Sequence, residues 1–155
     1  MNRKFTLGLV LGVLVAAVAA TGIVTYAQAK RPYRDGSVWQ MSFIRMKPGM
    51  ESAYLTYIAS DWKKEQEALK KDGLVLSYKV ITSEGHSPTD WNIVLMTEFK
   101  NLATMEANAD KAEAVGMAAV GADDQKMRQG YKDRLEIREI LGERQAREIV
   151  LEPKP

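Results

Sequence analysis

An apolar run in residues 91–99 constrains the fold more than any other feature of the sequence. Residues 93–96 read Ile-Val-Leu-Met. Because successive residues of a strand point to opposite sides, this run places apolar side chains on both faces of a strand. A strand buried on both faces belongs in the middle of a covered sheet. The length of 155 residues, with 46% hydrophobic and 27% charged residues, is typical of one globular domain.

The segments before this run predict two strands and one long helix. Residues 38–46 alternate as a first strand, and Lys47-Pro48-Gly49 ends it. Apolar residues then recur three, four and seven positions apart, which predicts a helix over residues 50–71. Residues 74–82 alternate again as a second strand, and a polar loop follows at 83–90. The first strand has an apolar side formed by Trp39, Met41 and Phe43 and a second one formed by Val38, Ile44 and Met46.

The segments after the apolar run predict a second helical region and a last strand. Asn101 is a suitable N-cap for a helix that extends to about residue 115, where Gly116 and Gly121 interrupt the pattern. Asp123 can cap a continuation that ends near residues 141–142. Residues 145–151 then form a short final strand, and the prolines in the tail at 152–155 prevent further pairing.

This order of elements predicts an α+β domain. Two right-handed βαβ units interleave into a ferredoxin-like βαββαβ fold, with a four-stranded antiparallel sheet and helices on one face. The other face, which carries Trp39, Met41 and Phe43, would then expose a larger apolar surface than soluble monomers usually do. We therefore expect a second copy of the chain to cover it, which makes the protein a homodimer paired through this sheet face.

The first 29 residues have the layout of a secretory signal. Arg3 and Lys4 precede an uncharged segment that ends in Ala27-Gln28-Ala29. Small residues at this spacing fit signal peptidase, so we expect cleavage after Ala29 and a periplasmic or secreted product. An uncleaved anchor is the alternative, because the uncharged segment is long enough to cross a bilayer; only then would the protein contact a membrane. A polar linker at 30–37 leads to the domain at 38–151.

The charge and the missing cysteines exclude several classes of partner and site. The formal net charge is +2, and the signal contains two basic and no acidic residues, so the exported part is formally neutral. We therefore expect no nucleic-acid partner. A chain without cysteine and with one histidine offers no standard structural metal site, and we expect no metal and no cofactor. Neither a phosphate-binding glycine loop nor a serine nucleophile motif is present.

The element order and the turn Phe43-Ile44-Arg45-Met46-Lys47-Pro48-Gly49 resemble the dimeric α/β-barrel superfamily. The layout is similar to its NIPSNAP-type and antibiotic-biosynthesis monooxygenase branches, over about residues 38–151. The superfamily includes cofactor-free oxygenases, haem-degrading enzymes, lactone isomerases and proteins of unknown role, so the resemblance implies a fold and no single reaction. Haem-degrading members present a histidine from a helix, whereas His86 falls in a predicted loop. The resemblance therefore transfers no functional residue.

Three polar residues in or just after the predicted loop at 83–90 are candidates for catalysis. His86 is the one side chain with a pKa near neutrality, and Asp90 follows four residues later, so the pair could form an oriented base. Asn92 could stabilise an oxyanion beside an aromatic substrate. The alternative is that His86 is an exposed loop residue and that the nearby tryptophans pack in the core. The candidate ligand-pocket residues are Trp39, Tyr54, Tyr57 and Trp91. Core packing is the alternative for all four, and it is the commoner role of aromatic residues at these spacings.

Three functions remain open from the sequence. The leading one is an exported homodimer that binds a small apolar or aromatic molecule between the helix layer and the sheet, without an assigned reaction. The second is a cofactor-free monooxygenase or a haem-handling enzyme. The third is a structural or interaction module without catalysis, whose dimer surface uses all of the exposed apolar area.

Overall fold

The computed structural model describes residues 31–84, 87 and 89–152. The predicted signal at 1–29 and most of the tail at 152–155 lie outside these residues. Contacts divide the described chain into two units, residues 35–149 and a small unit of residues 31–34 with 150–152. In the small unit, the Glu152 amide donates to the Pro32 carbonyl at 2.9 Å, and Arg34 Nε lies 3.5 Å from Glu152 Oε1. The main unit carries the rest of the fold.

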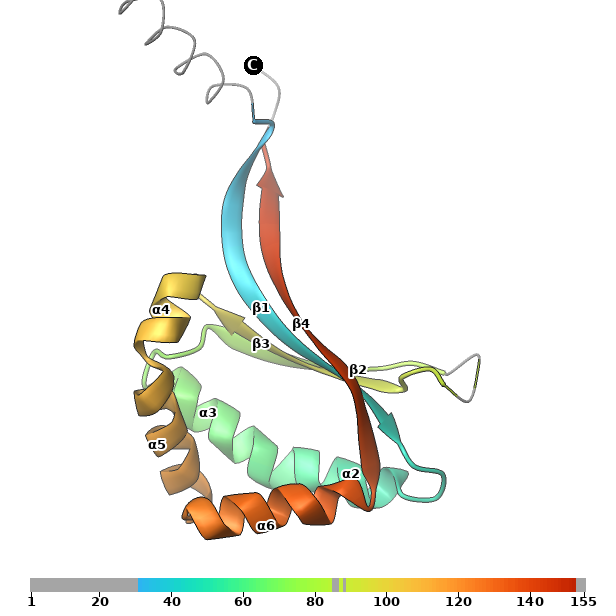
Figure 1. Cartoon of the computed structure of the whole chain (residues 1–155). Helices are drawn as coiled ribbons and strands as arrows, with labels where there is room; N and C mark the ends of the chain where they lie inside the picture. Colours follow the sequence, from blue (N-terminus) through green and yellow to red (C-terminus); the bar gives the residue numbers. More distant parts are fainter. Residues whose placement is uncertain (1–30, 85–86, 88, 153–155) are drawn as a thin grey trace, which may run out of the picture. The chain divides into compact units, whose positions relative to one another are not determined.

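The sheet has four strands in the order β2-β3-β1-β4. Their bounds are β1 (Tyr33–Met46), β2 (Ser77–Thr82), β3 (Ile93–Phe99) and β4 (Arg138–Leu151). Strand β3 pairs antiparallel with both β1 and β2, so the strand with apolar residues on both faces does lie inside the sheet. In the main unit the helices lie on one side of the sheet (Figure 1). This strand order confirms the ferredoxin-like α+β fold.

The strand register separates two apolar faces. Ile44 pairs with Ile93 in the register of β1 and β3, and both side chains are fully buried against the helices. Phe43 pairs with Val94, which in turn pairs with Ile81 of β2, and these three side chains form a row on the opposite face. No helix of the main unit covers this opposite face (Figure 1). We call it the open face; its apolar residues are Trp39, Met41, Phe43, Ile81, Val94 and Met96.

The first helical segment is continuous but changes type in its middle. It comprises α2 (Glu51–Tyr57), the π-helical turn η1 (Ile58–Trp62) and α3 (Lys63–Lys71). The buried residues along it are Tyr54, Ile58, Trp62 and Gln66, one every four positions. In a pure α-helix, a spacing of four drifts around the axis because a turn has 3.6 residues. The wider π turn reduces this drift, and all four side chains face the sheet.

The second helical region has three helices, α4 (Leu102–Ala107), α5 (Ala109–Val120) and α6 (Asp124–Leu135). Asn101 caps α4 by accepting from the Thr104 amide at 2.8 Å, and Asp123 caps α6 by accepting from the Lys126 amide at 2.8 Å. Gly121 ends α5 in a left-handed conformation with φ of 62°. None of these three helices contains a fully buried residue. They are therefore less buried than the first helical segment.

Several boundaries differ from those predicted. Residues 33–37, predicted as a linker, belong to β1, because they lie opposite the long β4: Ser37 Oγ donates to Glu148 Oε2 at 3.1 Å. Gly116 lies inside α5 and does not interrupt it. Helix α6 ends at Leu135, and β4 begins at Arg138, seven residues before the predicted strand at 145. Here pairing with the neighbouring strand overrides the helical spacing of the sequence.

Candidate functional site

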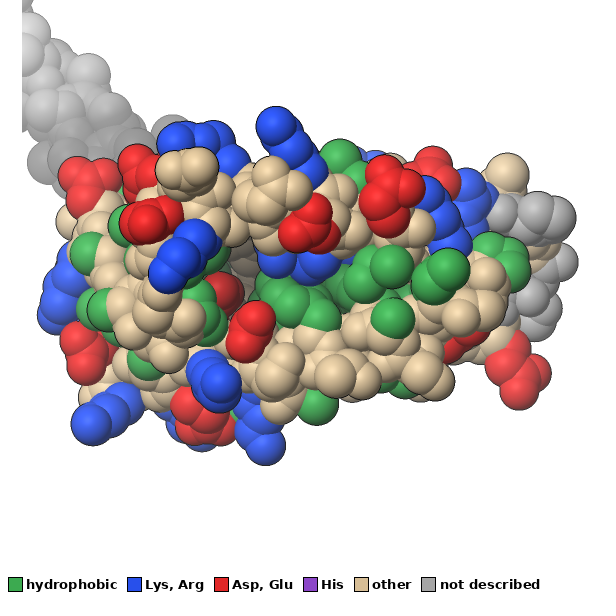
Figure 2. Space-filling model, turned by 90° about the horizontal axis from the view of Figure 1, so that it is seen from below, with side chains coloured by type: hydrophobic (Ala, Val, Ile, Leu, Met, Phe, Trp, Pro, Cys, Tyr) green, Lys and Arg blue, Asp and Glu red, His purple; other side chains and the backbone are tan. Residues whose placement is uncertain are grey.

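A cavity of about 300 Å³ lies between α3, α5 and α6. This volume is at the lower end of the range for small-molecule pockets. Figure 2 views the helix side from below and shows a groove with charged side chains along its edges. The cavity is lined by Glu65, Leu69, Ala112, Glu113, Gly116, Met117, Asp124, Met127 and Arg128. We call it the helix-layer cavity.

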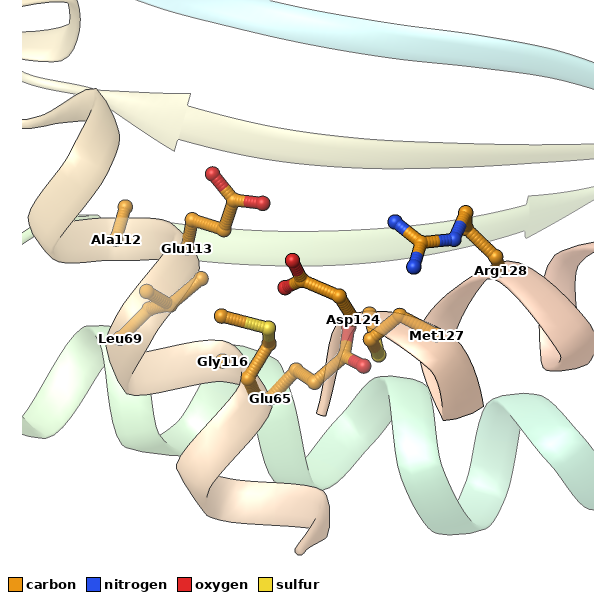
Figure 3. Close-up of a pocket in the computed structure, with 9 residues that line it drawn as sticks. Glu65, Leu69, Ala112, Glu113, Gly116, Asp124, Met127 and Arg128 are labelled. Atoms are coloured by element: carbon orange, nitrogen blue, oxygen red, sulfur yellow. The ribbon is translucent and has the colours of Figure 1, made fainter. Parts of the chain in front are cut away.

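Carboxylates from three different helices line this cavity. Glu65 comes from α3, Glu113 from α5 and Asp124 from α6. Figure 3 shows these three side chains around the cavity, with the Arg128 side chain to their right. Burial raises the pKa of Glu65, and Asp61 acts in the same direction, whereas the positive charge of Arg134 opposes the shift. Three acids against one lining arginine give the site an excess of negative charge. The site is therefore suited to a cationic group.

The remaining wall of the cavity is apolar. Leu69, Met117 and Met127 supply an aliphatic side chain and two thioethers. A Cβ atom placed on Gly116 would lie 4.0 Å from Glu65 Cγ, so a side chain there would extend into the space between α5 and α3. Flexible thioethers adapt to ligands of irregular shape. The cavity thus combines acidic groups with a short apolar wall.

The two tyrosines predicted for a ligand pocket lie on α2 and do not belong to the lining of this cavity. The Tyr54 ring is fully buried in the core and stacks on the Tyr57 ring, with centroids 5.9 Å apart. Burial raises the pKa of Tyr54 to about 12 and also raises the pKa of Tyr57. The guanidinium carbon of Arg134 lies 4.4 Å from the centroid of the Tyr57 ring. Both hydroxyls therefore stay protonated at neutral pH.

The two predicted pocket tryptophans do not join these tyrosines. Trp39 lies on the open face, with Lys79 Nζ 5.0 Å from its ring centroid. Trp91 packs edge to face against Phe43, also on the open face, with centroids 5.8 Å apart. The four candidate pocket residues are thus divided between the two sides of the sheet and do not form one pocket.

The catalytic candidates occupy the region before β3. His86 lies outside the described residues. Asp90 Oδ2 accepts from the Ser87 amide at 3.0 Å, which closes a local turn. The Asn92 amide bonds to both backbone groups of Met46, so its main contacts serve the structure. Asp90 and Asn92 line a surface pocket of about 480 Å³ together with charged residues of β1 and β4.

The acidic lining of the helix-layer cavity was not predicted from the sequence. Glu65 lies in a run of alternating charges that is typical of a solvated helix face. A signal existed in Gly116, because a glycine inside a helical pattern often marks a close approach or a free space. Among the described residues, no three His, Asp or Glu side chains are arranged to hold a metal ion. Within the same part of the chain, no helix is both long and apolar enough to span a bilayer.

Comparisons with known proteins find similarity only at the level of structure. No protein-family model and no curated protein matches the sequence. HapK from Hahella chejuensis is 12% identical, covers 70% of this chain and 90% of its own, and has a TM-score of 0.44. A NIPSNAP family protein of unknown function from Agrobacterium tumefaciens is 17% identical, covers 77% and 93%, and has a TM-score of 0.45. A dimeric protein of unknown function and ferredoxin-like fold from Bacteroides fragilis is 18% identical, covers 77% and 98%, and has a TM-score of 0.41.

Proposed function

We propose that the protein is an exported homodimer that binds a small organic cation in the helix-layer cavity. The single observation that carries this proposal is the arrangement of Glu65, Glu113 and Asp124 around a space of about 300 Å³. An ammonium group near these carboxylates gains charge-assisted hydrogen bonds. The sequence alone favours an apolar or aromatic ligand, and the acidic lining changes this expectation.

The apolar wall of the cavity determines the size and polarity of the uncharged part of the ligand. Leu69, Met117 and Met127 offer room for a short hydrocarbon chain or one ring. The ligand class that fits both parts of the cavity is therefore an amine or a quaternary ammonium ion with a small apolar body. Arg128, which is also in the lining, could contact a hydroxyl or carbonyl oxygen of such a ligand.

The homodimer part of the proposal is supported by the open face. In the monomer Trp39, Met41 and Phe43 are half-buried, whereas Ile81 keeps 45% of its surface exposed. An apolar sheet face can pair with the same face of a second copy across a two-fold axis. The helix-layer cavity lies on the other side of the sheet and is open in either state.

A binding experiment with matched probes tests the proposed function. Butylamine and butyltrimethylammonium are titrated into the purified protein by calorimetry, with butanol as the uncharged probe. We expect both cations to bind more tightly than butanol by at least tenfold, and we expect Asp124→Asn and Glu113→Gln each to weaken binding by three- to tenfold. Glu106→Gln, an exposed acid outside the cavity, is the matched control and should bind like the wild type.

Other outcomes decide between the alternatives. Equal affinity for butanol and butylamine would overturn the cationic ligand class. If no probe binds, the small-molecule role fails and the structural or interaction module is favoured. A Soret shift on titration with haem would instead support the haem-handling alternative. Signal cleavage is tested separately, by the N-terminal sequence of the exported protein, which we expect to begin at Lys30.

A further inference from the structure

Two arginines at the junction of α6 and β4 have buried donors without acceptors. Arg134 is in the last turn of α6, and Arg138 is the first residue of β4. Arg138 is only 6% exposed, and its Nε and Nη1 atoms are buried without a hydrogen-bond partner, as is Arg134 Nε. Among the described residues, no carboxylate lies within ion-pair distance of either guanidinium. The positive charge of this junction is therefore not neutralised by a direct contact.

Tyrosine rings and one more free donor surround these arginines. The guanidinium carbon of Arg138 lies 5.5 Å from the ring centroid of Tyr54 and 5.7 Å from that of Tyr131. The Tyr54 side chain is fully buried, and its hydroxyl also lacks a hydrogen-bond partner. The cluster thus places guanidinium N–H groups and a phenol near one another without an acceptor. We call Tyr54, Tyr131, Arg134 and Arg138 the Arg138 cluster.

The local chain holds this cluster in place. The Ile137 amide donates to the Arg134 carbonyl at 3.2 Å, and the Lys47 amide donates to the Ile137 carbonyl at 3.0 Å. These bonds tie the junction to the end of β1. The fold thus fixes the backbone of both arginines at this junction, and both guanidinium groups act electrostatically on the Tyr54 hydroxyl.

The energetics of the cluster favour the binding of an acceptor that the described residues do not supply. A buried charge without a hydrogen-bonded partner is strongly unfavourable. A cation–π contact offsets only part of this cost, because an aromatic ring does not replace the oxygen acceptors that N–H groups need. Glu65 acts on Arg134 through space, but it makes no direct ion pair with Arg134, and it lines the helix-layer cavity. An external anion would complete the site.

We propose that the Arg138 cluster binds the carboxylate of a small organic acid. A carboxylate is an acceptor-only group, so it suits donors from Arg138, Arg134 and the Tyr54 hydroxyl. The tyrosine rings supply apolar walls for the organic part of the ligand. The Tyr131 side chain remains 46% exposed, so the cluster meets solvent beside α6. The cluster shares no residue with the lining of the helix-layer cavity, and this inference does not rest on the proposed function.

Titration of the purified protein with sodium benzoate, at constant ionic strength, tests this site. Arginine Nε–H resonances are followed by nuclear magnetic resonance, and the melting temperature is recorded in parallel. We expect benzoate to move the resonances of Arg138 and Arg134 and to raise the melting temperature. We expect Tyr54→Phe, which preserves shape, to weaken benzoate binding about five- to tenfold through the loss of one donor.

Matched variants and probes keep the proposal falsifiable. Arg138→Met, which replaces the guanidinium with an unbranched apolar chain, should abolish benzoate binding, and its circular dichroism and melting curve check that it folds. Arg144→Gln, an exposed arginine of β4, should bind benzoate like the wild type. Inorganic phosphate is the competing anion, and tighter binding of phosphate than of benzoate would overturn the carboxylate class. The site itself is overturned if no anion shifts the Arg138 resonance, or if Tyr54→Phe and the wild type bind benzoate equally.

The two binding proposals fail separately. Loss of butylamine binding in Asp124→Asn should leave benzoate binding intact, because Asp124 lies outside the Arg138 cluster. Tyr54→Phe should in turn leave butylamine binding intact.

Discussion

The side-chain amide of Asn92 holds both backbone groups of Met46. Asn92 Oδ1 accepts from the Met46 amide at 2.8 Å, and Asn92 Nδ2 donates to the Met46 carbonyl at 3.4 Å. The backbone amide of Asn92 also donates to the Ile44 carbonyl at 3.0 Å. These bonds join the segment before β3 to the end of β1 and so fix the turn that leads into α2.

We expect Asn92→Ala to lower the free energy of unfolding by about 1–3 kcal/mol, because the buried backbone groups of Met46 lose their partner. Asn92→Asp retains an acceptor for the Met46 amide but loses the donor, so its loss should be smaller. Urea denaturation measures both values. Unchanged stability in Asn92→Ala would show that water replaces the amide and that this contact is not structural.

The cap of α6 should make stability depend on pH. The Lys126 amide, which donates to the Asp123 carboxylate, lowers the pKa of Asp123 from its ordinary value of 3.8. A carboxyl with a lowered pKa in the folded protein stabilises it above pH 3.8, and this contribution disappears as the pH falls through the lowered value. Melting temperatures measured between pH 2 and pH 6 should show this loss.

Asp123→Asn is the matched variant for the cap. It retains an N-cap oxygen but has no titrating carboxyl, so the difference in melting temperature between it and the wild type should shrink as the pH falls below 3.8. A constant difference over the whole pH range would contradict the assignment of this titration to Asp123.

The open face predicts the effect of a single charge on assembly. Ile81 is 45% exposed on this face, whereas its neighbour Val80, which is 39% exposed, points to the other side of β2. We expect Ile81→Glu to convert the dimer to a monomer and Val80→Glu to leave it dimeric, as measured by light scattering at micromolar concentration. A monomeric wild type, or a dimeric Ile81→Glu, would refute pairing through this face.

The buried Tyr54 hydroxyl, which has no hydrogen-bond partner, predicts an unusual effect of its removal on the free energy of unfolding. Because this buried hydroxyl has no acceptor, Tyr54→Phe should leave the ligand-free protein unchanged or stabilise it by up to about 1–2 kcal/mol. The control is Tyr78→Phe, since the Tyr78 hydroxyl donates to Glu67, and its loss should destabilise by about 0.5–1.5 kcal/mol. Urea denaturation without added anions compares the two. A clear loss of stability in Tyr54→Phe would mean that the hydroxyl is bonded in solution.

The fold could be predicted from the sequence because its main signals are local. Alternation placed Phe43 and Ile44 on opposite faces of β1, and the register of β1 with β3 confirms it. The apolar run at 93–96 located the inner strand. These patterns depend on the periods of strands and helices, which every residue of an element shares.

The cavity and the Arg138 cluster could not be predicted, because they depend on residues that are far apart in the sequence. Glu65 and Asp124 lie on helices separated by two strands. Arg138 follows Met127, Tyr131 and Leu135, which are spaced as in a helix. This spacing led to a predicted helix that continues past Leu135, where α6 ends. Only the positions of α5 and α6 beside the first helical segment bring these residues together.

The π-helical turn η1 couples the position of the cavity to the helix type of one segment. Residues 58–62 place Trp62 and then Gln66 against the sheet, where Thr97 Oγ1 donates to Gln66 Oε1 at 3.1 Å. A plain α-helix over the same residues would turn further per residue than the π turn, and it would therefore rotate α3 about its axis relative to α2. Gln66 would then lose Thr97, and Glu65 would turn away from α5. Related sequences that keep the fold and the length of this segment but lack the π turn should therefore have a different cavity.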